Sequence, residues 1–166
     1  QINLLSAFTA AAVVFFFQET IDRLLILTIF LPVLTDQSAN TGGQALAITL
    51  RGIILGDIKP GMRNDLIRKE ALLGILNGAL VGIIAGAVMY TIAYLQNSPS
   101  ALMLGVAVFL AMIGSCLVSG ISGAVVPLAL KRFGTDPFTA STIFLTTATN
   151  ITSMAMLLGF AALLVK

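Results

Sequence analysis

The chain has 166 residues, of which 58% are hydrophobic and only 10% are charged, and its mean hydropathy is +1.04. In soluble domains about a quarter of all residues are charged, so this composition predicts an integral membrane protein. The length predicts a single domain, 1–166. The chain has no histidine and one cysteine, Cys116, which excludes an intrachain disulfide and a His/Cys zinc or haem site. With a net charge of +2 and its basic residues at the edges of apolar segments, it has no stripe for nucleic acid.

Charged and turn residues divide the chain into five apolar segments, each of which predicts a membrane-spanning helix. The segments are 4–17, 24–55, 71–95, 101–130 and 137–165. The first is short for a span, and we expect its helix to begin upstream of Gln1. We expect Pro32 to kink the second helix, and Asn64 or Asp65 to cap the helix that leads into the third. Asp136 followed by Pro137 is a good start for the fifth.

The distribution of Lys and Arg predicts the orientation of the chain. Basic residues gather in two of the loops, 51–70 and 131–136, which we therefore place in the cytoplasm. The protein is then a multi-pass protein of the cell membrane, with Gln1 inside and Lys166 outside. We interpret Asp57, Asp65 and Glu70, which lie among these basic residues, as solvated loop charges.

A polar stretch interrupts the second segment. Asp36, Asn40 and Gln44 recur at every fourth residue and so share one face of a helix, while Gly42 and Gly43 provide a point where the backbone can open. A carboxylate, amides and exposed carbonyls are oxygen ligands suited to a cation. The alternative is a helix-contact face, with glycine for close approach and amides for interhelical hydrogen bonds.

A second polar stretch lies in the fifth segment, where Thr146, Thr147 and Asn150 belong to a stripe of hydroxyl and amide side chains. Threonines alone are tolerated in membrane helices because they bond to the preceding turn, but Asn150 is a strong amide at mid-span. At about 1.5 Å per residue, Asp36 lies roughly 22 Å from Arg51 and Asn150 roughly 21 Å from Asp136. The two stretches therefore reach similar depths, which favours a water-filled ion path between them.

At these residues the chain resembles the transport domain of the MgtE magnesium channel family. Similarity covers the whole chain and rests on four motifs in order. They are Pro32 followed by Asn40, Gly42 and Gln44; Arg51-Gly52 with Gly56 and Pro60; Asp136-Pro137 with Ala140-Ser141; and Thr146-Thr147 ahead of the position of the family's pore acid.

The resemblance implies a homodimer in the lipid bilayer, whose central pore is lined by the second and fifth helices and passes hydrated Mg²⁺. It implies an ion path through Asp36, Asn40, Gly43, Gln44, Thr146, Thr147 and Asn150, with Asp36, Asn40, Asn150 and Asp136 as candidate metal contacts. Asp136 has a second interpretation as a simple helix cap. The family's cytoplasmic regulatory parts, an acidic helical domain and a pair of CBS domains, are not in this sequence, so we expect such domains as separate partners.

One position departs from the family pattern, because Asn150 stands where the family has its pore aspartate. The carbonyl oxygen is kept and the charge is lost. Three explanations stay open: the charge is supplied elsewhere, with Asp36 as the candidate; the protein is not selective for magnesium; or Asn150 was engineered.

Divalent cation transport, with magnesium first, is thus the function that the sequence favours. The alternatives are a sodium- or proton-coupled cation transporter that uses Asp36, and a non-transporting membrane assembly subunit whose polar faces bind a partner helix. An enzyme is not expected, because the sequence supplies no nucleophile with a base within reach.

Overall fold

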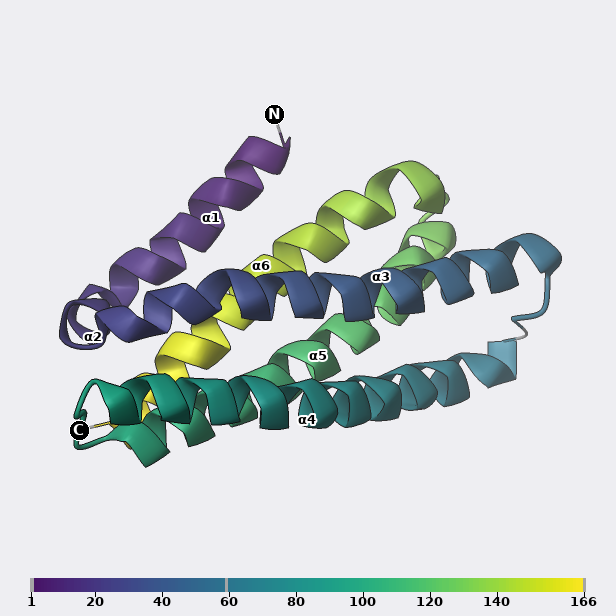
Figure 1. The fold of residues 1–166 in the computed structure, drawn as a ribbon. Helices are drawn as coiled ribbons and strands as arrows, with labels where there is room; N and C mark the ends of the chain where they lie inside the picture. Colours follow the sequence, from purple (N-terminus) through teal and green to yellow (C-terminus); the bar gives the residue numbers. More distant parts are fainter. Residues whose placement is uncertain (1, 59, 166) are drawn as a thin grey trace.

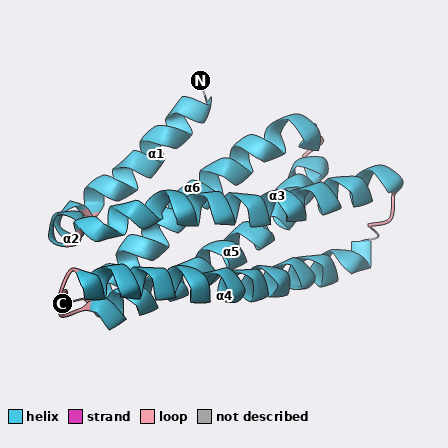
Figure 2. Cartoon of the chain, viewed as in Figure 1, coloured by secondary structure: helices cyan, strands magenta, loops and turns pink. Residues whose placement is uncertain are grey.

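The computed structural model describes residues 2–58 and 60–165, and helix is the only regular secondary structure in that part of the chain (Figure 2). The α-helices are α1 (Ile2–Phe16), α2 (Gln18–Arg23), α3 (Leu31–Leu55), α4 (Arg63–Leu95), α5 (Ala101–Arg132) and α6 (Pro137–Leu164), and the two 3₁₀ helices are η1 (Leu25–Phe30) and η2 (Pro60–Met62). The prediction of an all-α protein is confirmed.

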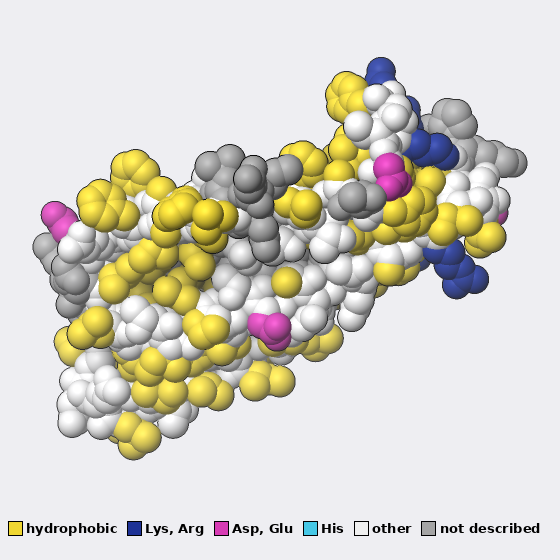
Figure 3. All heavy atoms as spheres, turned by 90° about the horizontal axis from the view of Figure 1, so that it is seen from above, with side chains coloured by type: hydrophobic (Ala, Val, Ile, Leu, Met, Phe, Trp, Pro, Cys, Tyr) yellow, Lys and Arg dark blue, Asp and Glu magenta, His cyan; other side chains and the backbone are white. Residues whose placement is uncertain are grey.

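The four long helices, α3 to α6, run side by side along the molecule, and α5 packs against the other three (Figure 1). The connections α3–α4 and α5–α6 lie at one end of the bundle. Helix α2, the α4–α5 turn and the C-terminus lie at the other end, and α1 packs against α6. The Lys and Arg side chains visible in Figure 3 gather at one end, as the distribution of basic residues in the sequence predicts.

Three helices are long and apolar enough to cross a membrane by length and composition: α4, α5 and residues Ala140–Leu164 of α6. The apolar part of α1, Ala7–Phe16, is shorter than the roughly 20 residues that a span needs. Helix α3 has 25 residues, but polar side chains interrupt its apolar character. The structure therefore supports a multi-pass membrane protein, and the count of five spans stays a prediction.

Two expectations about helix boundaries are wrong. Pro32 does not kink a helix, because η1 precedes it and it occupies the first turn of α3, where its missing N–H removes no intrahelical bond. Asn64 and Asp65 do not cap α4, which follows η2 directly and begins at Arg63 with no side-chain cap at Met62. The 3₁₀ turn takes the place of a cap because it leads the backbone into helical conformation.

The apolar core fills the half of the bundle that lies away from the basic loops. The first half of α5 contributes most of the core, and η1, the start of α3 and the ends of α4 and α6 pack against it. Leu34, Met89 and Met112 are completely buried in this core. The large apolar side chains on the other face of α4, among them Leu80 and Ile84, are exposed. Such a face suits contact with lipid.

Helices α4 and α5 approach closely along a row of glycines. Gly74, Gly78, Gly82 and Gly86 recur every fourth residue and so form one stripe on α4. A Cβ atom at Gly78 would lie 2.8 Å from the Cα of Ile113, and one at Gly74 would lie 2.5 Å from the Cys116 carbonyl oxygen. The contact therefore requires glycine on α4, as small-residue interfaces between membrane helices generally do.

Candidate functional site

Helix α3 presents one polar, exposed face. Asp36, Asn40, Gly43 and Gln44 are all exposed on it, and the Asn40 side-chain Nδ2 donates a hydrogen bond to Asp36 Oδ2 at 3.3 Å. The bond follows from the spacing of four residues, which places the two side chains one turn apart on the same side. The prediction that these residues share a helix face is confirmed.

A hollow of about 560 Å³ lies along this face. Its lining brings together Asn40, Gly43 and Gln44 with Gln37 of the same helix and Asn77 of α4. Amide side chains dominate the lining, and a helix surface of this kind is unusual in an apolar bundle because lipid offers amides no partners. The hollow is thus a candidate place for water or a hydrated ion.

The glycine pair does not open the backbone. Helix α3 continues unbroken through residues 42 and 43, which corrects the expectation of an opening there. Gly42 is buried, and a Cβ atom on it would overlap the Ser119 hydroxyl of α5 and lie 2.8 Å from Leu145 Cδ1 of α6. Gly42 therefore serves close packing, whereas Gly43 faces open space.

A hydroxyl network sets the register between α3 and α6. Ser38 Oγ lies 2.6 Å from Ser153 Oγ, both buried, and the Ser119 hydroxyl of α5 donates to the Ser38 carbonyl oxygen. The two helices are antiparallel (Figure 1). Because Ser38 and Ser153 are level with each other, Thr41, three residues after Ser38, is level with Asn150, three residues before Ser153. The two polar stretches therefore overlap in level, but Asn150 lies about 7.5 Å along the helix axis from the level of Asp36, which the estimate from sequence had placed at the same depth.

The α6 side chains show two kinds of behaviour. Thr146 and Thr147 donate to carbonyl oxygens of their own helix, those of Thr142 at 2.9 Å and Ile143 at 2.8 Å. These bonds are the ordinary ones for threonine in a helix. Asn150 is half-buried, and within the described part of the chain its amide makes no hydrogen bond. Its oxygen and nitrogen therefore remain available to water or an ion.

Asn77 is a residue of the hollow that the sequence reasoning missed. Its Nδ2 donates to Thr41 Oγ1 at 2.7 Å, and this bond joins α4 to the polar stretch of α3. Thr41 Oγ1 also lies 3.0 Å from the Gln37 carbonyl oxygen and 3.6 Å from Cys116 Sγ. The signal was present, because Asn77 is a strong amide in the middle of an apolar segment, the same argument that singled out Asn150.

Glu70 was misinterpreted as a solvated loop charge. It lies in α4, is only 4% exposed, and its Oε1 is buried without a hydrogen-bond partner among the described residues. A Cβ atom added to Gly120 of α5 would lie only 2.6 Å from the backbone carbonyl oxygen of Glu70, so α5 packs closely against α4 at this residue. The early start of α4, before the third apolar segment, carries Glu70 into the contact with α5 and so explains its burial.

Asp136 is a helix cap. Its carboxylate accepts a hydrogen bond from the Phe138 backbone N–H at 3.0 Å, and Pro137 follows at the first helical position, as predicted. About fourteen residues of helix separate it from Asn150, so it does not belong to the polar hollow. No group of three or more His, Cys, Asp or Glu side chains gathers into a metal cage anywhere in residues 2–58 and 60–165.

The chain matches a known family over most of its length. The sequence profile of MgtE, described as a divalent cation transporter, covers residues 31–160. This chain therefore belongs to the MgtE family.

Similar proteins include three that are named magnesium transporter MgtE. The one from Enterococcus faecalis is 27% identical over 158 residues, 95% of this chain and 34% of its own length. Those from Bacillus subtilis and Thermus thermophilus are each 25% identical, over 92% and 99% of this chain and 32% and 35% of their own lengths. The chain thus spans about a third of these relatives.

Proposed function

We propose that this chain is the membrane domain of a magnesium transporter and that the polar face of α3 lines the ion path. The observation that carries the proposal is the amide-rich hollow on α3, next to which Asp36 lies one turn from Asn40. Asn150 of α6 lies at the level of Thr41 and does not line the hollow of the single chain. The relatives named magnesium transporters support the choice of cation.

The chemistry of this face suits magnesium in its hydrated form. Mg²⁺ dehydrates reluctantly and keeps several of its waters, so it needs oxygen and amide groups that contact those waters more than it needs a cage of carboxylates. Asp36 supplies the charge, while Asn40, Gln44 and Asn150 supply amide oxygens. The absence of an acidic cluster among the described residues is compatible with this mode of binding.

A homodimer completes the path. The polar face of α3 is exposed in a single chain, and lipid contact would leave its amides and Asp36 without partners. A second copy related by a two-fold axis would cover the face and double every group on it. Helices α3 and α6 of both copies then line the pore, with the basic loops in the cytoplasm, and cytoplasmic regulatory domains act as partners of this membrane domain.

The proposal is tested by dye-reported Mg²⁺ uptake into proteoliposomes that contain the folded dimer. We expect uptake above that of empty vesicles, and a strong reduction by Asn40→Ala, because this change removes an amide from the hollow. Thr91→Ala, which removes a polar group from an exposed part of α4, is the control. Undiminished uptake by Asn40→Ala would show that α3 does not line the path.

The two alternatives give different results in the same vesicles. Uptake that requires an imposed sodium or proton gradient would indicate a coupled transporter. No uptake by any folded dimer, together with loss of a protein complex on Asp36→Asn, would indicate an assembly subunit instead.

A further inference from the structure

The amide of Asn77 on α4 has a fixed orientation beside the polar face of α3. Its Nδ2 donates to Thr41 Oγ1 at 2.7 Å. The Thr41 hydroxyl directs its own hydrogen to the Gln37 carbonyl oxygen at 3.0 Å or to Cys116 Sγ at 3.6 Å. In both cases a lone pair of the hydroxyl is left to accept from Asn77. The amide nitrogen therefore faces Thr41, and the amide oxygen faces away from it.

The oxygen of Asn77 is open to the hollow on α3. It makes no hydrogen bond within the described part of the chain, and the buried, unpartnered polar atoms of that part belong to other residues. Asn77 lines the hollow of about 560 Å³ together with Gln37, Asn40 and Gln44. Amides from two helices thus surround one space, and the Asn77 oxygen is an acceptor inside it.

The packing of α4 turns Asn77 toward α3. Gly74 and Gly78 face α5, at distances that only glycine allows. Asn77 precedes Gly78 by one residue, so its side chain lies about 100° around the helix from that contact. Helices α3 and α4 pack mainly against α5 and not against each other. The hollow therefore stays open between them, and α4 reaches it through Asn77.

We infer that Asn77 belongs to the ion path and that its oxygen accepts a hydrogen bond from a water of a hydrated divalent cation, while Thr41 holds the amide in this orientation. The inference rests on the proposed function. Hydrated Mg²⁺ keeps several of its waters, and each of them donates hydrogen bonds, so acceptors at fixed positions recognise the intact hydration shell. Helix α4 thereby takes part in selecting the cation.

Mg²⁺ uptake into proteoliposomes, measured over a range of Mg²⁺ concentrations and with hexaamminecobalt(III) as an inhibitor, tests the inference. The ammonia ligands of this complex do not exchange, and they donate hydrogen bonds as the waters of hydrated Mg²⁺ do. Asn77→Leu keeps the size of the side chain and removes the oxygen. We expect it to raise the half-saturating Mg²⁺ concentration roughly fivefold and to weaken inhibition by a similar factor, which is the effect of one lost hydrogen bond.

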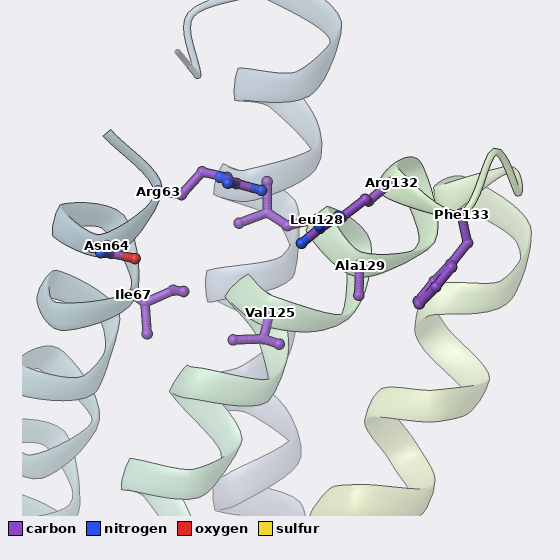
Figure 4. A pocket seen from close by; sticks show the side chains of 8 residues that line it. All are labelled: Arg63, Asn64, Ile67, Val125, Leu128, Ala129, Arg132 and Phe133. Carbon is purple, nitrogen blue, oxygen red and sulfur yellow. The ribbon is translucent and has the colours of Figure 1, made fainter. Parts of the chain in front are cut away.

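Asn64→Leu is the matched control. It removes an amide from the same helix, but Asn64 lines a separate hollow at the basic end of the bundle (Figure 4). Its half-saturating concentration and its inhibition should equal those of the parent.

Variants of Thr41 test its positioning role. Thr41→Val keeps the shape, removes the hydroxyl that accepts from Asn77, and should also raise the half-saturating concentration. Thr41→Ser keeps the hydroxyl and should behave as the parent does. Because Thr41 acts through Asn77, the double variant Asn77→Leu/Thr41→Val should be no weaker than Asn77→Leu alone.

The results separate this inference from the proposed function. Unchanged half-saturation and inhibition in Asn77→Leu, in a protein whose uptake falls with Asn40→Ala, would overturn the inference alone. A lower thermal unfolding midpoint of Asn77→Leu in detergent, with unchanged inhibition by hexaamminecobalt(III), would mean that the bond to Thr41 only joins two helices. No uptake by the folded parent would overturn the proposed function, and this inference with it.

Discussion

Asp36 is the one carboxylate on the polar face of α3, and its environment is made of amides. Asn40 donates a hydrogen bond to it, and the uncharged Asn150 lies on α6 at the level of Thr41, about 7.5 Å along the helix axis from Asp36. Under the proposed function the charge in the ion path therefore depends on Asp36. A unit charge about 4 Å from an ion contributes about 1 kcal/mol in bulk water and about 4 kcal/mol at an effective dielectric constant of 20.

Asp36→Asn should consequently lower Mg²⁺ uptake into proteoliposomes by at least about fivefold, which is what the lower of these energies, about 1 kcal/mol, implies. The control is Asp65→Asn, which removes the same charge from the basic end and should leave uptake nearly unchanged. Combining Asp36→Asn with Asn150→Asp moves the charge across to α6 and should restore part of the uptake. Equal uptake by Asp36→Asn and the parent would contradict the role given to Asp36.

Glu70 is a buried carboxylate, and we expect its charge to affect the stability of the protein. Burial of one carboxylate oxygen without a hydrogen-bond partner costs free energy, because a charged group loses its hydration. Glu70→Gln keeps the shape and removes the charge, so the thermal unfolding midpoint in detergent should stay the same or rise. Glu19→Gln, at an exposed position, is the control and should have no effect. A clear fall for Glu70→Gln would reveal a favourable partner for the carboxylate.

At the scale of elements, the glycine stripe of α4 determines how closely α4 and α5 pack. Its spacing of four residues and the steric distances at Gly74 and Gly78 leave no room for a side chain. The hydroxyl network of Ser38, Ser119 and Ser153 plays a comparable role between α3, α5 and α6. The bundle is thus held by close backbone approach and short polar contacts as well as by its apolar core.

Gly78→Ala should lower stability, because its Cβ would lie 2.8 Å from both the Met112 carbonyl oxygen and the Ile113 Cα. Overpacking of this kind costs about 1–3 kcal/mol, which a fall in the thermal unfolding midpoint in detergent would report. Gly159→Ala in α6 has no atom within 4 Å of the new Cβ. It should raise stability by up to about 1 kcal/mol, because alanine favours helix. A stable Gly78→Ala protein would show that the α4–α5 contact is looser than described.

Sequence patterns predicted the helices well where length and caps were clear. Asp136-Pro137 starts α6 and the 96–100 turn separates α4 from α5 as predicted, because these signals are local. The start of α4, the position of Pro32 and the burial of Glu70 were missed because they depend on the 3₁₀ helices and on which face meets α5. Periodicity predicts that Asp36 and Asn40 share a face, but it does not show which neighbouring helix contributes Asn77.

At the scale of the whole molecule, the two ends and the middle of the bundle have distinct chemistry. One end carries the basic loops, the far half holds the apolar core, and an exposed polar face lies along α3. A single copy leaves this face open, and under the proposed function a second copy encloses it. Cations then pass between the α3 and α6 polar faces of two subunits.

The most direct test is a density map of the protein in lipid with Mg²⁺, and with Mn²⁺ as a heavier substitute. We predict a two-fold dimer with ion density on its axis, at the level of Asp36, Asn40 and Asn150, and loss of that density in Asp36→Asn. A dimer whose α3 polar faces point away from the axis, or an axis without ion density at that level, would show that ions do not pass along α3.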